Sequence, residues 1–303
     1  MNLALSTMWW GEGLTAVEEL VWRTRDLGFE RIELEYRRPA DTLPRLRQAM
    51  AAAGLAVSSV HAPFPHPGGS EDPLRQADLS AEEPAGRRRA EELVARTLEH
   101  AAEWGAGAVV LHSGGIASLP PLGRRLHELY MAGQKDSVEF QRVRAELVQL
   151  RAQEAPRRLE WIRQALGRLV PRARSLGLVI ALENRAYYRD LPVLEEMGLL
   201  LDEFGPTVGY WHDLGHAFRL DVQGFSPQEE WLRRFGGRLV GLHIHDSMGL
   251  DDHRPPGYGE IPIGRLAPLF PPQGLRVLEV RADFVEADVQ AGLAHLRALG
   301  VLP

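Results

Sequence analysis

The sequence predicts a single α/β domain, a (β/α)8 TIM barrel formed by residues 1–303. Two observations carry this prediction. Short β-rich segments alternate with longer helical patterns along the whole chain, as in repeated βα units. Several segments are also nearly continuously apolar, such as VVL at 109–111 and LVIAL at 178–182, as strands covered on both faces must be. A length of 303 residues is normal for one such barrel.

Eight strands are expected, and several of them follow a glycine that ends the preceding helix, at positions 28, 54, 105 and 177. A last helix over Glu286–Leu299 completes the ring. Eight such βα units close into a barrel. The expected strands are Leu3–Ser6, Arg31–Leu34, Ala56–His61, Ala108–His112, Val179–Glu183, Val208–His212, Leu239–His243 and Arg276–Glu279.

Two longer segments interrupt the repeat. Residues 122–155, after the fourth strand, carry a polar and mostly helical pattern ahead of the helix expected near Arg157–Ser175. A helical insertion after a barrel strand projects over the C-terminal mouth, as a lid or as an oligomer surface. The sequence does not choose between these, so the oligomeric state stays open. The loop at 66–83, rich in proline, glycine and acidic residues, is expected at the same mouth.

Composition excludes several classes of protein. With 45% hydrophobic and 25% charged residues the chain is typical of soluble globular proteins. It has no apolar run near the ~20 residues of a membrane span, and its first segment lacks a signal-peptide pattern, so a cytoplasmic location is expected. The absence of cysteine excludes disulfides and thiolate ligands. The net charge of −6 does not favour nucleic acid, but a local basic patch would be compatible with it.

Nine potential metal ligands stand where expected strands give way to loops. Each alone has an ordinary explanation: Glu183 could pair with Arg185, and Asp213 could cap a helix. Because the strand ends of a barrel converge on one mouth, the whole set predicts a metal site. The segment HIHDS places His243 and His245 on the same side of a strand, so by spacing alone either could be the ligand. The nine are His61, His112, Glu183, Asp213, His216, His243, Asp251, His253 and Glu279.

The number of ligands predicts more than one ion. A catalytic zinc takes three or four protein ligands and keeps one position for water. Nine ligands with one shared carboxylate would hold three ions. Since no cysteine is present, all of them must be bound through nitrogen and oxygen.

The segments that carry these ligands resemble the xylose isomerase-like barrel superfamily and, within it, endonuclease IV, over essentially the full length. They read HAPF, HSG, LEN, DLGH, HIHDS and DDHRPPGYGEI. The resemblance implies three zinc or manganese ions. It places the first on His61, His112 and Glu183. The second is bound by the bridging Glu183 with Asp213, His243 and Glu279, and the third by His216, Asp251 and His253. It favours His243 over His245.

The implied reaction is hydrolysis of a phosphate ester, in which metal ions activate a water and neutralise the leaving oxygen. Glu183 and Glu279 are the expected catalytic carboxylates. The expected substrate is a phosphate-containing small molecule or a nucleic-acid lesion. The chain departs from endonuclease IV after the second strand, where acidic Glu33 and Glu35 stand in place of residues that enter the minor groove.

A second interpretation is a sugar isomerase or epimerase of the same superfamily. These enzymes bind one divalent ion, and the resemblance implies Glu183, Asp213, His243 and Glu279 as its ligands. The two glutamates then act as acid and base beside a carbonyl. This interpretation comes second because that branch does not need His112, Asp251 and His253 together. A metal-binding barrel without turnover is a third interpretation.

Overall fold

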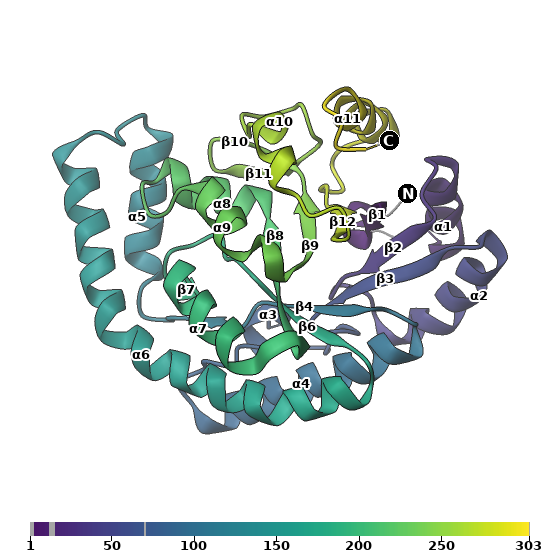
Figure 1. Ribbon diagram of the computed structural model, residues 1–303, viewed down its shortest axis with the longest axis horizontal. Helices are drawn as coiled ribbons and strands as arrows, with labels where there is room; N and C mark the ends of the chain where they lie inside the picture. Colours follow the sequence, from purple (N-terminus) through teal and green to yellow (C-terminus); the bar gives the residue numbers. More distant parts are fainter. Residues whose placement is uncertain (1–2, 12–15, 70, 303) are drawn as a thin grey trace.

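The computed structural model describes residues 3–11, 16–69 and 71–302. Eight parallel strands form a closed barrel in the order β1-β12-β9-β8-β6-β4-β3-β2 (Figure 1), which confirms the predicted fold. Every predicted strand is present, with ends within one residue of those expected. The strands are β1 (Leu3–Ser6), β2 (Arg31–Leu34), β3 (Ala56–His61), β4 (Ala108–Leu111), β6 (Val179–Glu183), β8 (Val208–Asp213), β9 (Leu239–Ile244) and β12 (Leu275–Leu278).

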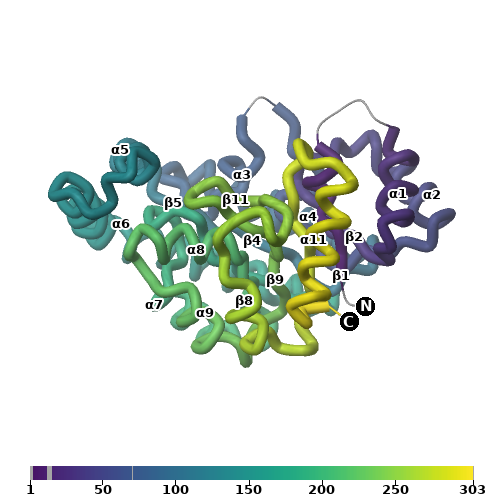
Figure 2. The backbone as a smooth tube through the Cα atoms, turned by 90° about the horizontal axis from the view of Figure 1, so that it is seen from above, coloured from purple at the N-terminus to yellow at the C-terminus, as the bar shows by residue number. Residues whose placement is uncertain are grey.

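Helices surround the barrel on its outside, and α11 closes the ring beside β1 near both ends of the chain (Figure 2). Leucine, valine and alanine side chains of these helices form one large buried cluster with the outward faces of the strands. The helices of the ring are α1 (Val17–Asp26), α2 (Leu43–Ala53), α4 (Pro84–Glu103), α6 (Val138–Ser175), α7 (Leu194–Phe204), α8 (Leu214–Val222), α9 (Gln228–Phe235) and α11 (Glu286–Ala298).

A small second cluster fills the inside of the barrel. It is made of short side chains around one large one, Trp211, which is fully buried. Gly241 on the neighbouring strand leaves the space for this indole, since a Cβ there would collide with the ring. The Trp211 ring also lies 5.1 Å from the ring of His243, in an edge-on arrangement. Trp211 thus forms a rigid support under the side chains at the barrel mouth.

The helical insertion differs in one respect from the expectation. It contains α5 (Pro120–Met131), but the rest of it and the expected barrel helix form one continuous helix, α6, of 38 residues. Pro156 and Pro171 lie inside this helix without ending it. Figures 1 and 2 both show α5 and the first turns of α6 projecting from the side of the barrel.

Two antiparallel ribbons at the C-terminal mouth fix the loops there. The strands β5 (Gly114–Gly115) and β7 (Asp190–Leu191) tie the loop after β4 to the loop after β6. The strands β10 (Asp246–Met248) and β11 (Asp251–Arg254) form a hairpin after β9. The predicted loop at 66–83 contains the short helix α3 (Pro73–Gln76), and its Ser70 lies outside the described residues. Within the described chain, we find no helix of the length and apolar character needed to cross a membrane.

Candidate metal centre

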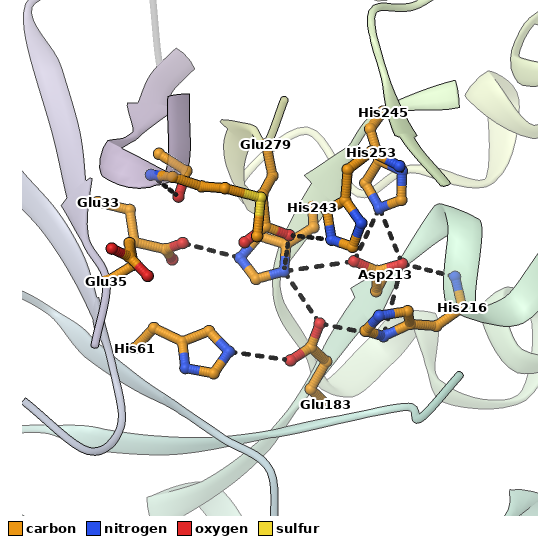
Figure 3. A network of polar contacts seen from close by, with 12 residues as sticks. Glu33, Glu35, His61, Glu183, Asp213, His216, His243, His245, His253 and Glu279 are labelled. Atoms are coloured by element: carbon orange, nitrogen blue, oxygen red, sulfur yellow. Dashed lines mark hydrogen bonds and ion pairs between the residues drawn. The ribbon is translucent and has the colours of Figure 1, made fainter. Parts of the chain in front are cut away.

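Histidine and carboxylate side chains gather at the C-terminal ends of the strands (Figure 3). They are almost fully buried, although they are polar and several carry charge. Four groups among them have three or more ligand atoms within 4.8 Å of one another, the arrangement that a metal ion requires. The groups are His61, His112 and Glu183; Glu183, Asp213 and His243; Glu33, His243 and Glu279; and Asp213, His245, His253 and Glu279.

His243 lies at the centre of this arrangement. Its Nδ1 atom is 3.0 Å from Glu183 Oε1 and 3.2 Å from Glu279 Oε2. A third carboxylate oxygen, Asp213 Oδ2, lies 3.5 Å from the same nitrogen. One ring nitrogen carries at most one proton and cannot neutralise three buried carboxylates. A divalent cation bound among these atoms would satisfy all of them, so the donor set fits a metal ion.

The opposite side of the same ring is held by Glu33. His243 Nε2 lies 2.9 Å from Glu33 Oε1, and Glu33 Oε2 accepts a hydrogen bond of 2.7 Å from the Ser59 hydroxyl. This short contact favours the tautomer of His243 that carries a proton on Nε2. This contact orients Nδ1 toward the three carboxylates. Sequence reasoning did not include Glu33 among the ligands, although its place near the end of a buried strand follows the same pattern as Glu183.

A second group of ligands lies beside Glu183. Its Oε2 atom is 2.5 Å from His112 Nε2 and 3.4 Å from His61 Nε2. The two imidazoles also face each other, with their Nε2 atoms 3.3 Å apart. A buried carboxylate oxygen faced by two ring nitrogens is a donor set that could also hold a cation.

The hairpin after β9 supplies a third group. His245 Nε2 lies 3.1 and 3.0 Å from the two oxygens of Asp213, and its ring stacks on that of His253 at 4.2 Å. His253 Nε2 lies 3.4 Å from Glu279 Oε2. The resemblance had assigned His245 to a non-ligand position. Alternation along the strand placed His243 and His245 on the same side, and both rings do reach the cluster.

The charges of the cluster depend strongly on one another. Burial raises the pKa of Glu279, but His243 and His253 more than compensate, and the pKa falls to about 2. Burial also raises the pKa of Glu183, but His112 and His243 lower it by more, so that it lies well below its usual range. Burial lowers the pKa of His243, but Glu279, Glu33 and Glu183 together raise it well above its usual value. The carboxylates are therefore ionised at neutral pH, as metal ligands must be.

Two predicted ligands lie differently from the others. Asp251 points away from the cluster and forms ion pairs with Arg254 (2.7 Å) and Arg281. Its neighbour Asp252 turns inward instead and lies 2.9 Å from His253 Nδ1. His216 reaches the cluster, with its Nδ1 atom 3.5 Å from Glu183 Oε1, but the same nitrogen lies only 3.0 Å from the backbone oxygen of Asn184.

The sequence also allowed an explanation without a metal for Glu183, an ion pair with Arg185, and for Asp213, a helix cap; the structure excludes the first and confirms the second. Arg185 does not pair with Glu183; it lies 3.7 Å from Asp190 instead. Asp213 does cap a helix, since its Oδ1 accepts a hydrogen bond of 2.7 Å from the His216 backbone at the start of α8. Asp213 also contacts both His243 and His245. The capping bond fixes the carboxylate in the orientation that the cluster uses.

The cluster forms the base of a cavity of about 400 Å³. Met8, Tyr36 and Tyr187 contribute apolar surface to its walls, and arginine side chains contribute charge. A cavity of this size, mostly apolar with a few convergent polar groups, is typical of a small-molecule site.

The fold agrees with the comparisons to known proteins. A family model described as a xylose isomerase-like TIM barrel matches residues 21–299. This chain belongs to that family. Among curated proteins, no sequence relative was found.

Several solved structures match nearly the whole chain. A D-tagatose 3-epimerase-like protein matches with a TM-score of 0.69 and 18% identity, covering 99% of this chain and 97% of its own. The 3-keto-D-glucoside 4-epimerase YcjR from E. coli matches with a TM-score of 0.69 and 19% identity, over 98% and 99% of the two chains. The TTHB071 protein from Thermus thermophilus, soaked with ZnCl₂, matches with a TM-score of 0.59 and 24% identity, over 99% and 98%.

These findings contradict the prediction of a phosphate-ester hydrolase with an endonuclease IV-like centre. The similar structures that match along nearly the full chain include sugar epimerases, among them a D-psicose 3-epimerase and an L-ribulose 3-epimerase. The geometry gives a physical reason. The implied third metal ion needs Asp251, and that carboxylate is turned away into ion pairs with arginines. The sugar isomerase or epimerase interpretation needs none of this third set.

Proposed function

We propose that this protein is a divalent-metal-dependent isomerase or epimerase of a sugar. One observation carries the proposal: two buried carboxylates, Glu183 and Glu279, face the same His243 nitrogen at the base of a sugar-sized cavity. They come from strands separated in the barrel by β8 and β9, so they approach the cavity from different sides. The names of the similar structures, which are those of sugar epimerases, support this interpretation.

We propose that Glu183, Asp213, His243 and Glu279 hold one catalytic ion, zinc or manganese, in place of the three ions first expected. Imidazole suits zinc, and a set rich in carboxylate suits manganese. When bound, the ion supplies positive charge that polarises the carbonyl and hydroxyl oxygens of the sugar. His216 and Asp251 have other partners in the structure, so we assign no ion to them.

The two glutamates would move the proton. Both are ionised at neutral pH, so either carboxylate can accept the proton from the carbon beside the carbonyl. If the same carboxylate returns that proton to the neighbouring carbon while a hydroxyl proton moves between the two oxygens, the product is an isomer. If the other glutamate takes up a proton from water and delivers it to the opposite face of the same carbon, the product is an epimer. Tyr36 and Tyr187 in the cavity wall would help to exclude water from this step.

Proton exchange in D₂O tests the proposal directly. The manganese-loaded protein would be incubated with a panel of ketohexoses and ketopentoses, and NMR would follow the proton on the carbon beside the carbonyl. We expect deuterium to replace that proton and an epimer or isomer to appear. If the metal-loaded protein exchanged no proton in any member of the panel, the proposed function would be wrong.

Removal of the metal is expected to abolish this exchange. The reason is that the carbon acid beside a carbonyl is too weak for a carboxylate base unless the oxygens are polarised. EDTA treatment followed by dialysis should lower the exchange rate to background, and added Mn²⁺ or Zn²⁺ should restore it. Elemental analysis of the restored protein should give about one tightly bound ion per chain. Activity that survives complete removal of metal would contradict the proposed role of the ion.

Glu33→Gln is expected to weaken metal binding by about 10- to 100-fold while leaving the ligands themselves intact. A glutamine side chain has only one oxygen that can accept a hydrogen bond. It therefore loses either the contact with His243 Nε2 or the hydrogen bond from Ser59. Metal titration of the apoprotein measures the change. The matched control is Glu30→Gln, since the Glu30 side chain is 64% exposed just before the same strand. Equal affinities in the two variants would show that Glu33 does not position His243.

A further inference from the structure

We propose that the substrate carries an anionic group, a phosphate or a carboxylate, which binds between Arg185 and Arg219 in the wall of the cavity. This inference rests on the proposed function for the reaction. It adds the substrate class, which is acidic or phosphorylated sugars. It is based on the positive charges of Arg185 and Arg219, which the carboxylates of the protein neutralise only in part.

Arg219, on α8, is a buried cation bound only to neutral groups. Its side chain lines the cavity and is only 6% exposed. One Nη atom donates to the backbone oxygen of Leu250 and the other to His127 Nδ1, each at 3.0 Å, while Nε has no partner. In the part of the chain that the structure describes, no carboxylate forms an ion pair with it. A buried charge without a countercharge is costly, and an anionic ligand would remove that cost.

Arg185 adds a second, incompletely neutralised cation. It follows the metal-ligand glutamate of β6 by two residues, and one of its Nη atoms is buried with no hydrogen-bond partner. Its nearest carboxylate is Asp190, at 3.7 Å, which is too long for a hydrogen bond. The same Asp190 lies 3.7 Å from Arg189 as well. One carboxylate is therefore shared between two guanidinium groups, which leaves positive charge on this wall.

Tyr187 lines the same cavity wall as Arg185 and Arg219. Its ring lies 4.4 Å from the Arg219 guanidinium and 3.9 Å from that of Arg189. A second cavity, of about 380 Å³, adjoins the first, and Arg185, Tyr187, His112 and Leu74 line both. Arg185 thus stands at the junction, a short distance along the chain from Glu183. A sugar with its carbonyl end at the carboxylates could place a terminal anionic group at this junction.

The α5–α6 extension holds this wall in place. Arg151 of α6 donates to the backbone oxygens of Tyr188 (2.6 Å) and Asp190 (3.1 Å). It also forms a two-bond ion pair with Glu196, at 2.8 and 2.7 Å. His127 of α5, which accepts from Arg219, comes from the same extension. Figure 1 shows α5 beside α8. The loop and the helix that carry the two cations are both fixed by one structural addition to the barrel.

Isothermal titration of the manganese-loaded protein tests the proposal with three ketoses that differ at one end only. D-fructose has a terminal hydroxyl, D-fructose 6-phosphate a phosphate and D-fructuronate a carboxylate, and inorganic phosphate serves as the anion alone. At least one anionic ketose is expected to bind about tenfold or more tightly than D-fructose, because a guanidinium–anion hydrogen bond is charge-assisted. Which of the two gains affinity identifies the anion as phosphate or carboxylate.

The same titrations with Arg185→Gln and Arg219→Gln should lose this advantage, while Arg185→Lys should keep part of it. Arg233→Gln is the matched control, since the Arg233 side chain is 65% exposed on α9, away from the cavity. The metal content of each variant is measured beside the affinity. The proposal is overturned if neither an anionic ketose nor inorganic phosphate binds at least about threefold more tightly than D-fructose. It is equally overturned if the advantage survives both glutamine variants.

Exchange in D₂O separates this proposal from the proposed function. Proton exchange on a neutral ketose, without any arginine-dependent gain in affinity for the anionic ketoses, overturns the anion site and keeps the epimerase or isomerase. Arginine-dependent binding of an anionic ketose without exchange on any ketose overturns the proposed reaction and keeps the anion site.

Discussion

Glu183→Gln is expected to lower the rate of ketose proton exchange by about 1000-fold or more and to remove the bound metal ion. Glu183 takes part in two of the ligand groups: its Oε1 atom faces His243 Nδ1 at 3.0 Å, and its Oε2 atom faces His112 Nε2 at 2.5 Å. Glutamine has nearly the same shape but lacks the negative charge and cannot accept a proton. Loss of a general base alone costs about 100- to 10,000-fold, and loss of the ion adds to it.

NMR exchange rates and elemental analysis measure the two effects separately. The matched control is Glu195→Gln on α7, because the Glu195 side chain is 72% exposed; it should keep both the rate and the metal. Thermal unfolding of both variants checks that the fold is intact. If Glu183→Gln kept its full metal content and an unchanged exchange rate, Glu183 would be neither a metal ligand nor a catalytic base. The proposed mechanism would then be wrong.

The barrel and most of the centre could be predicted because both follow from repeating patterns. Apolar runs such as Val179–Leu182 predicted strands covered on both faces, and the structure buries Ile180, Ala181 and Leu182 of this run. A polar side chain that ends such a run, like Glu183, must then lie at the mouth where all strand ends meet. This argument needs only the period of the strand and the closure of the barrel, so it succeeds without any knowledge of the loops.

The same argument fails where a ligand comes from a loop. Asp251, Asp252 and His253 lie in a hairpin whose register shifts between Asp246 and Met248. His253 also adopts a left-handed backbone conformation, with a φ of 57°. Neither feature has a regular period, so the sequence could not show that Asp252 turns toward His253 while Asp251 turns away. Glu33 was not counted among the ligands for another reason, since it lies within the strand Arg31–Leu34 and not at its last residue.

The reaction was predicted wrongly because the ligand types are shared by two branches of one family. Glu183, Asp213, His243 and Glu279 serve in the hydrolase and the isomerase interpretations alike. The residues that were to separate them were His112, Asp251 and His253. Of these, Asp251 is engaged by Arg254 and Arg281, a fact of tertiary structure that no motif contains. The choice of reaction therefore depends on where a few loop side chains point.

Arg151→Gln is expected to destabilise the protein by roughly 3 kcal/mol and to weaken the proposed anion site. Arg151 is only 4% exposed, and its ion pair with Glu196 is largely buried. Removal of one partner leaves a buried carboxylate without its countercharge, which costs about 3–5 kcal/mol in other proteins. The backbone oxygens of Tyr188 and Asp190 lose their donors at the same time. Urea unfolding of the metal-loaded protein measures the loss of stability.

Arg163→Gln provides the contrast within the same helix. Arg163 also pairs with a glutamate, Glu203, but that pair is exposed and should contribute little to stability. The titration with anionic ketoses then gives the functional part of the comparison. Arg151→Gln should reduce their advantage over D-fructose, because the loop that carries Arg185 loses its anchor, whereas Arg163→Gln should leave it unchanged. Equal stability and equal ketose affinity in the two variants would mean that the extension does not hold the wall of the cavity.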